Sequence, residues 1–275
     1  MRSQDVLRLY EEGYRDFTRL SLPGLDLSGR ILVDVNFAHS DLTGANFSRT
    51  FLTKANFEGA TLSQANFQFA KISNACFQSA ILTKSILQGS FAVRANFSAA
   101  SMSGVKMSHI NLRAAILTQA NCAGSNLTGA NLRNADLQGS KLAWANMSGV
   151  RLIGAVITHA DFTDVRLENA LLNGLNFSGM DLSGVNFQSA RLKGASFQRA
   201  DLTAANFEYA SLQNSNFSQA RLAGANLSHT HLHKAKFLYT DLRRVDSTYV
   251  DWEDAQLTVS GENNSEMSVQ HFATA

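Results

Sequence analysis

Large apolar residues recur at every fifth position through most of this 275-residue chain. From Leu22 to Leu257 the series has 48 members, and 45 of them are Leu, Phe, Ile, Met or Trp. No insertion shifts the frame within that span. An α-helix repeats every 3.6 residues and a β-strand every two. A period of five therefore excludes ordinary amphipathic helices and strands as the main element of the fold.

Each five-residue unit has the same order of residue types. A small residue, most often Ala, lies two positions before the apolar centre, with Asn or Asp between them, as in Ala45, Asn46 and Phe47. Ser, Thr or Gln follows the centre, and then a variable residue that is often Gly. We expect the small residue and the centre to point inward. Asn suits a turn, because it tolerates unusual backbone angles and forms local hydrogen bonds.

A second period, four units long, lies inside the first. When every fourth centre is placed in one column, the first column is Phe at eight of eleven positions, the column opposite is mixed, and the other two are mostly Leu. The phenylalanines of the first column are Phe37, Phe57, Phe77, Phe97, Phe177, Phe197, Phe217 and Phe237. This alternation predicts a coil of four five-residue sides, with bulky rings on two opposed sides. The 48 units would make about twelve coils, spaced about 4.8 Å apart as paired strands are.

The pattern resembles the pentapeptide-repeat family over about residues 20–257. The resemblance implies an all-β solenoid, a right-handed quadrilateral β-helix, and the handedness comes from the resemblance alone. The segment VLRLYEEGYRDF is similar to the N-terminal cap of cyanobacterial members. We therefore expect a helical cap at 1–19, the repeat body at 20–257 and an acidic, polar tail at 258–275.

Both ends of the repeat body need a cap. The N-terminal segment is typical of a short helix with Ser3 as its N-cap. Its apolar stripe should cover the first coil, and Phe17 should begin the Phe column. The stripe consists of Leu7, Tyr10, Tyr14 and Phe17, widened by Val6 and Leu9. At the other end we expect Trp252 to plug a frayed last coil, because Ser247 occupies the position of an apolar centre.

Charge and composition narrow the class of protein. Residues 20–245 carry 20 basic and 12 acidic side chains, whereas residues 246–275 carry six acidic and no basic ones, for a net charge of +2. No apolar run approaches the length of about 18 residues that a membrane helix needs, and the N-terminus lacks the apolar core of a signal peptide, so we expect no membrane span and a cytoplasmic location. Cys76 and Cys122 do not make a disulfide framework, which fits a reducing compartment.

The chain shows no constellation expected of an enzyme, because nothing combines a nucleophile, a base and an orienting group. Three alternating histidines could bind a metal such as zinc, although outward positions around a turn need not converge. They are His229, His231 and His233. Asp161, Asp181 and Asp201 recur at every fourth unit and either replace Asn at the turn or share protons or a cation. We predict no enzyme and no cofactor.

Apolar residues at positions expected to hold Asn or Asp are the clearest departures from the pattern. Ile81, Ile86 and Phe91 occupy this position at three consecutive turns, and Phe51 and Leu171 share a column with Phe91 when every fourth unit is aligned. Exposed apolar groups mark interaction surfaces when they cluster. The alternative is local repacking, in which Phe91 compensates for the undersized centre that follows it. We interpret the five as candidate partner-binding residues.

Three functions remain. The first is a non-catalytic protein–protein interaction scaffold or regulatory adaptor for an unidentified protein partner, as a monomer or weak homodimer. The resemblance adds that some cyanobacterial members are linked to heterocyst development. The second is nucleic-acid binding, disfavoured because the basic residues are spread over many columns. The third is DNA mimicry, by which some members occupy the DNA site of gyrase; the basic repeat body has the wrong sign for it.

Overall fold

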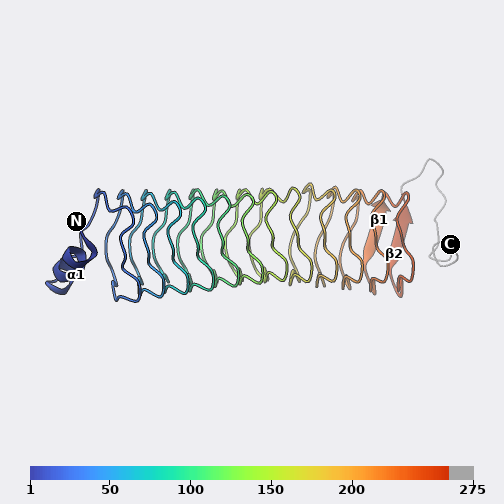
Figure 1. The fold of residues 1–275 in the computed structure, drawn as a ribbon. Helices are drawn as coiled ribbons and strands as arrows, with labels where there is room; N and C mark the ends of the chain where they lie inside the picture. Colours follow the sequence, from blue (N-terminus) through green and yellow to red (C-terminus); the bar gives the residue numbers. More distant parts are fainter. Residues whose placement is uncertain (260–275) are drawn as a thin grey trace. The chain divides into compact units, whose positions relative to one another are not determined.

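A computed structural model describes residues 1–259 of the chain (Figure 1). In this part, regular elements are few. They are the helix α1 (Ser3–Glu11) and the strands β1 (Lys236–Thr240) and β2 (Gln256–Val259). Within the same residues, no helix combines the length and apolar character needed to cross a lipid bilayer.

The chain divides into two compact units. The first comprises Met1–Asn146 and Ala155–Asp161, and the second comprises Met147–Gly154 and Phe162–Ala275. Both units consist of coils of the same kind.

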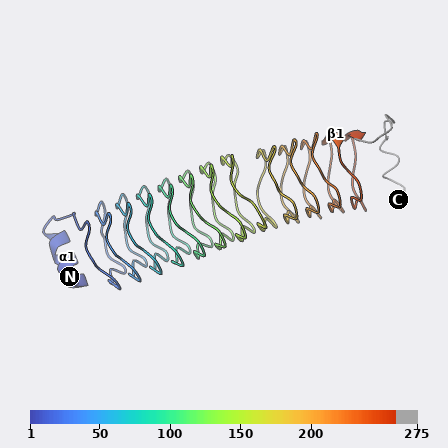
Figure 2. The same cartoon turned by 90° about the horizontal axis from the view of Figure 1, so that it is seen from above.

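Parallel pairing between equivalent residues of successive coils builds unit 1, as the stacked turns of the chain show (Figure 2). Asn56, for example, pairs with Asn36 on one side and with Cys76 on the other. The backbone N–H of Phe57 donates to the Cys76 carbonyl at 2.7 Å. One residue of every pentapeptide pairs in this way, so a coil of four pentapeptides has four sides, as the two periods predict.

The turn between two sides begins two residues after Asn, the position at which we expected it. The two residues after the apolar centre form it, and the second has positive φ, as in type II turns; Arg49 (φ 57) is an example. Asn46 lies on the flat side before this turn. Its Oδ1 accepts a hydrogen bond from the backbone N–H of Ser48 at 3.1 Å. Placing Asn in the turn was therefore wrong: its side chain fixes the turn from the preceding side.

Stacked phenylalanine rings occupy the interior of unit 1 from Phe17 to Phe97, after which Leu and Met predominate at the buried centres. Phe57, Phe77 and Phe97 follow one another at centroid distances of 4.9 and 4.8 Å with nearly parallel planes. The opposed column meets them edge-on, with Phe67 5.6 Å from Phe57 at 89°. All of these rings are fully buried. Edge-to-face and offset contacts are the favoured aromatic geometries, and they let two opposed ring columns share one interior.

Helix α1 is shorter than the apolar stripe suggested. Gly13 (φ 94) ends it: the N–H of Gly13 donates to the Tyr10 carbonyl and that of Tyr14 to the Leu9 carbonyl, which is a Schellman motif. Tyr14 therefore lies beyond the helix and is 51% exposed, and Phe17 lies in the first coil, where it is buried 5.5 Å from the next Phe ring of the column. Expecting these two residues on the helical face was wrong.

The contacts at the start of α1 also differ from expectation. The N-cap is Arg2, whose backbone N–H donates to the carboxylate of Asp5 at 2.9 Å. Ser3 is the first helical residue, and its hydroxyl accepts a hydrogen bond from the backbone N–H of Asp26 at 3.2 Å. Val6 is the residue of α1 that is fully buried. Ser3 thus ties the helix to the first coil instead of capping it.

Unit 2 repeats the architecture and contains both strands. Strands β1 and β2 pair in parallel, with Phe237 opposite Leu257. Its interior has the same ring stack, for example Phe197 and Phe217 at 4.8 Å. Trp252 is 7% exposed, and its ring meets that of Phe237 edge-on at 5.4 Å from the adjoining side, while Leu257 ends the Phe column.

Candidate binding surface

Two of the five candidate residues lie in one outward ladder of unit 1. Ile31 pairs with Phe51, Phe51 with Lys71 and Lys71 with Phe91, so these four residues follow one another along one side of the coils. We call them the ladder. Ile31 is 65% exposed, Phe51 46% and Phe91 43%. The structure therefore brings Phe51 and Phe91 together, with Lys71 between them.

The other three candidates lie elsewhere. Ile81 pairs with Thr61 and Ser101 on one side of the coils, and Ile86 lies on another side. Because one pentapeptide makes a quarter of a coil, residues at 81, 86 and 91 face three different sides. Ile81 lies on the side opposite the ladder. Leu171 is half-buried in unit 2. Grouping Ile81 and Ile86 with Phe91 on three consecutive turns was wrong, since neighbours in sequence are not neighbours on this surface.

Cationic side chains accompany the exposed rings of the ladder. The Lys71 ammonium lies 3.4 Å from the centroid of the Phe91 ring, which is a close cation–π contact. At a corner of the same side, Phe69 is 45% exposed, and the guanidinium of Arg49 lies 6.0 Å from its ring centroid. These pairs were not predicted from the sequence. Writing the chain in rows of four pentapeptides would have revealed them, because each pair shares a column.

The corners beside the ladder add further charge. A side begins and ends at turn residues with positive φ, so Arg49 and Lys54 lie at the two corners that flank Phe51. Arg94 lies at a corner beside Phe91 in the same way. Phe69 folds over the next corner, Gly89, where an added Cβ would lie 2.5 Å from a ring atom. We call Arg49, Lys54, Phe69 and Arg94 the ladder corners.

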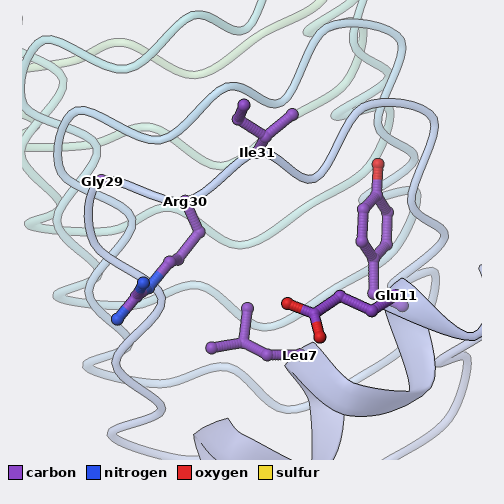
Figure 3. Close-up of a pocket in the computed structure, with 6 residues that line it drawn as sticks. Leu7, Glu11, Gly29, Arg30 and Ile31 are labelled. Atoms are coloured by element: carbon purple, nitrogen blue, oxygen red, sulfur yellow. The ribbon is translucent and has the colours of Figure 1, made fainter.

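An open cavity of about 420 Å³ adjoins the ladder at Ile31. Helix α1 forms one wall and the first coil the other, as Figure 3 shows. Its lining residues are Leu7, Tyr10, Glu11, Gly29, Arg30 and Ile31. Tyr10 is held in place, because its hydroxyl donates to the Val33 carbonyl at 3.0 Å and the guanidinium of Arg15 lies 3.7 Å above its ring. The cavity thus combines apolar walls with one carboxylate and one guanidinium.

The alternating histidines do not converge. The ring of His229 is stacked between Tyr209, at 4.6 Å, and Tyr249, at 4.9 Å. The Nδ1 atom of His233 lies 3.7 Å from the carboxylate of Glu253. Between residues 1 and 259, no three or more His, Cys, Asp or Glu side chains are grouped so as to hold a metal ion.

Asp201, the member of the aspartate column nearest the C-terminus of the three and part of unit 2, makes local contacts. Thr203 donates to Asp201 through its hydroxyl, at 2.6 Å, and through its backbone N–H, at 3.0 Å. These bonds, the hydroxyl first, lower the pKa of Asp201, and Arg221 at 3.5 Å acts in the same direction. The carboxylate therefore fixes a turn in the way that Asn does. This supports the interpretation that Asp replaces Asn in the repeat.

Coils of four pentapeptides with inward apolar centres define a β-solenoid repeat protein. Eight copies of the family model "Pentapeptide repeats" match the chain, at residues 21–59, 52–83, 75–114, 115–154, 151–188, 160–199, 181–219 and 210–246. The chain therefore belongs to the pentapeptide-repeat family, which confirms the resemblance seen in the sequence. A comparison with curated proteins finds no match.

Solved structures similar to this chain include two cyanobacterial pentapeptide repeat proteins and a resistance protein. HetL, a pentapeptide repeat protein involved in heterocyst differentiation regulation from the cyanobacterium Nostoc sp. strain PCC 7120, is 22% identical over 94% of this chain and 95% of its own, with a TM-score of 0.55. Rfr23 from the cyanobacterium Cyanothece 51142 is 24% identical over 60% of this chain and 99% of its own (TM-score 0.22). QnrB1, a plasmid-mediated fluoroquinolone resistance protein, is 16% identical over 86% and 90% (TM-score 0.29).

The likeness to HetL bears on the fold alone at this identity. Together with the matched repeats, it makes the coil a right-handed quadrilateral β-helix, preceded by one short helix.

Proposed function

We propose that this protein is a non-catalytic interaction scaffold whose repeat body, about twelve coils over residues 20–257, presents the ladder and the adjoining cavity to a protein partner. One observation carries the proposal. Three large apolar side chains, Ile31, Phe51 and Phe91, are 43–65% exposed in a single ladder next to an open cavity. Clustered exposed apolar groups beside a hollow are typical of interaction surfaces.

A contribution to the stability of the turn does not explain why apolar residues occupy these positions of the ladder. At the same position elsewhere, Asn56 and Asn66 accept a hydrogen bond from the backbone N–H two residues later, at 3.0 Å each. Ile or Phe cannot accept that bond, which is worth about 1 kcal/mol net. Ile31, Phe51 and Phe91 therefore each give up a turn-fixing contact and leave apolar surface in water. A partner that covers the ladder would remove this apolar surface from water.

The test compares two substitutions of equal exposure. Phe91 and Ile81 are each 43% exposed, but they lie on opposite sides of the coils. Immobilised wild type, Phe91→Glu and Ile81→Glu are used to capture proteins from a lysate of the source organism. Any protein retained by the wild type is then purified, and its Kd is measured for all three baits. Thermal unfolding of each bait establishes that it is folded.

The proposal predicts a protein that binds the wild type and Ile81→Glu and is lost with Phe91→Glu. Equal retention by all three baits would contradict the assignment of the ladder. Loss of the captured protein with Ile81→Glu alone would show that the binding surface is on the opposite side. A Phe91→Glu bait that does not fold would show that Phe91 acts in packing, as the alternative from the sequence holds.

A further inference from the structure

The side that carries the ladder is strongly basic, whereas the opposite side is not. Over the four coils from Gly29 to Arg94, the residues of the ladder side include five basic side chains and one carboxylate, that of Asp34. The basic ones are Arg30, Arg49, Lys54, Lys71 and Arg94. The opposite side, around Ile81, has one charge of each sign over the same length, Asp41 and Lys84. Positive charge is thus concentrated where apolar groups are exposed.

The backbone of the ladder is fully paired at Phe51, Lys71 and Phe91. The N–H of Phe51 donates to the Arg30 carbonyl at 2.8 Å, and the Phe51 carbonyl accepts from the N–H of Leu32 at 2.7 Å. The same pattern runs through Lys71 and Phe91. A partner cannot add a β-strand along these three residues. It must be recognised by side chains, through apolar contact and through the cations.

The cations also determine which kind of polyanion fits. Bases of a single-stranded nucleic acid bind by stacking on open aromatic faces. The ammonium of Lys71 occupies one face of Phe91, and Arg49 lies over Phe69. Ile31 is aliphatic and offers no aromatic face for a base. Carboxylate side chains, in contrast, can pair with the same cations while apolar side chains contact the rings.

The dimensions give the length of the bound segment. Coils are spaced by about 4.8 Å, the separation of paired strands, and the stacked rings of Phe77 and Phe97 show the same interval, 4.8 Å. Ile31 and Phe91 are three coils apart, or about 14 Å at that spacing. An extended chain advances about 3.3 Å per residue, so four or five residues would follow the ladder. With residues in the cavity, the segment has about eight residues.

We infer that the ladder and its corners bind an extended, acidic segment of a partner protein in which carboxylates alternate with apolar residues, and that one apolar side chain of the segment enters the cavity beside α1. This inference rests on the proposed function and names the chemistry of its partner. It predicts salt-sensitive binding, because exposed ion pairs are screened over about 10 Å at 0.1 M salt and about 3 Å at 1 M.

The experiment uses synthetic probes with the full-length protein. The main probe is a fluorescein-labelled peptide of about eight residues in which Glu and Leu alternate. Control peptides replace each Glu by Lys or each Leu by Ser, and a labelled oligothymidylate of similar length represents nucleic acid. Fluorescence anisotropy gives Kd for the wild type, for Lys71→Glu and for Lys84→Glu, which makes the same charge change on the opposite side.

We expect the Glu–Leu peptide to bind the wild type with Kd below about 1 mM and the two control peptides to bind at least about tenfold more weakly. Lys71→Glu should raise Kd for the Glu–Leu peptide by about tenfold or more, because repulsion replaces attraction, whereas Lys84→Glu should leave it within about twofold. Absence of saturation near 1 mM, an equal effect of both substitutions, or tighter binding of the oligothymidylate would overturn the inference.

The outcomes separate this inference from the proposed function. If Phe91→Glu abolishes capture of a cellular partner while the Glu–Leu peptide fails to bind, the ladder is the binding surface and the acidic chemistry is wrong. If the peptide binds in a Lys71-dependent way while capture is insensitive to Phe91→Glu, the ladder binds acidic segments but does not account for the scaffold's partner.

Discussion

The ammonium of Lys71 lies 3.4 Å from the centroid of the Phe91 ring, one coil further along the same ladder. Both side chains project outward, and Phe91 remains 43% exposed. The contact therefore orients the ring and places a positive charge on it without burying either group. It joins the apolar and the cationic character of the ladder in one pair of residues.

Replacing Lys71 by Met should leave the fold intact. An exposed cation–π contact contributes about 0.5–1 kcal/mol, so the unfolding free energy of Lys71→Met should fall by no more than about 1 kcal/mol. Urea denaturation followed by circular dichroism measures this change. A loss of several kcal/mol would mean that Lys71 has a structural role, and its use as a binding probe would then lose its basis.

The ring columns of the interior should tolerate Leu better than Ala. Phe77 is fully buried between Phe57 and Phe97, and Leu117 occupies the same column further along the chain. Phe77→Ala should cost about 3–5 kcal/mol of unfolding free energy through lost burial and a residual cavity, and Phe77→Leu clearly less. Thermal and urea unfolding of both variants tests the order. An equal loss of unfolding free energy in the two variants would contradict the view that Leu and Phe can replace one another at the centres of this column.

The interior of this fold was predictable, because the repeat itself fixes which residues point inward. Phe57 and Phe67 were expected on opposed sides, and their rings meet edge-to-face at 5.6 Å. Which surface residues lie close together could be predicted only for residues that share a column when every fourth pentapeptide is aligned. Phe51 and Phe91, separated by two complete coils, were expected together and do share a ladder. Ile81 is closer to Phe91 in sequence and yet faces the opposite side.

The cavity could not be predicted, because it depends on where α1 ends and how it docks. The apolar stripe from Leu7 to Phe17 suggested a longer helix. Gly13 ends the helix early through backbone bonds that a pattern of apolar residues does not describe. Tyr10, which lines the cavity, is then free to donate its hydroxyl hydrogen bond to the Val33 carbonyl. Contacts between a cap and its coil follow from tertiary docking and not from either period.

Buried hydroxyls at the small inward position should fall into two classes. The hydroxyl of Thr50 donates to the Leu27 carbonyl of the preceding coil at 2.8 Å. The hydroxyl of Ser85 is buried and, in the described structure, has no hydrogen-bond partner. Thr50→Val should therefore cost about 1 kcal/mol of unfolding free energy, whereas Ser85→Ala should be neutral or stabilising by about 1 kcal/mol.

Denaturation of these two variants beside the wild type measures the difference. Ala is the commonest residue at this position of the repeat, so Ser85→Ala introduces nothing foreign to the fold. A clear loss of stability in Ser85→Ala would show that its hydroxyl has a partner after all.

The two cysteines should differ sharply in reactivity. Complete burial raises the pKa of the Cys122 thiol to about 12, whereas Cys76 is half-buried at an outward pairing position. Since the thiolate is the reactive species, a raised pKa keeps Cys122 protonated and inert at pH 8. Iodoacetamide should modify one thiol of the native protein and two of the unfolded protein, as mass spectrometry can count. Cys76→Ser should leave none to modify in the native state.

The carboxylate of Asp201 should make the stability of unit 2 pH-dependent. The Thr203 hydroxyl and backbone N–H lower its pKa below the unfolded value of about 3.9. A lowered folded-state pKa stabilises the protein above the unfolded pKa, and this contribution is lost as the pH falls through the folded pKa. Thr203→Val removes the hydroxyl donor and should raise the pKa of Asp201 toward its usual value.

At pH 7, Thr203→Val should cost about 0.5–1 kcal/mol, because the pair is partly exposed. Once the pH is below the folded pKa, Asp201 is protonated in the wild type as well, so the cost attributable to the charge should disappear. Urea denaturation at several pH values measures this convergence, and an NMR titration of the Asp201 carboxyl measures its pKa directly. An unchanged Asp201 titration in Thr203→Val would show that the hydroxyl does not hold the carboxylate, and the turn-fixing role assigned to this column would then rest on the backbone N–H alone.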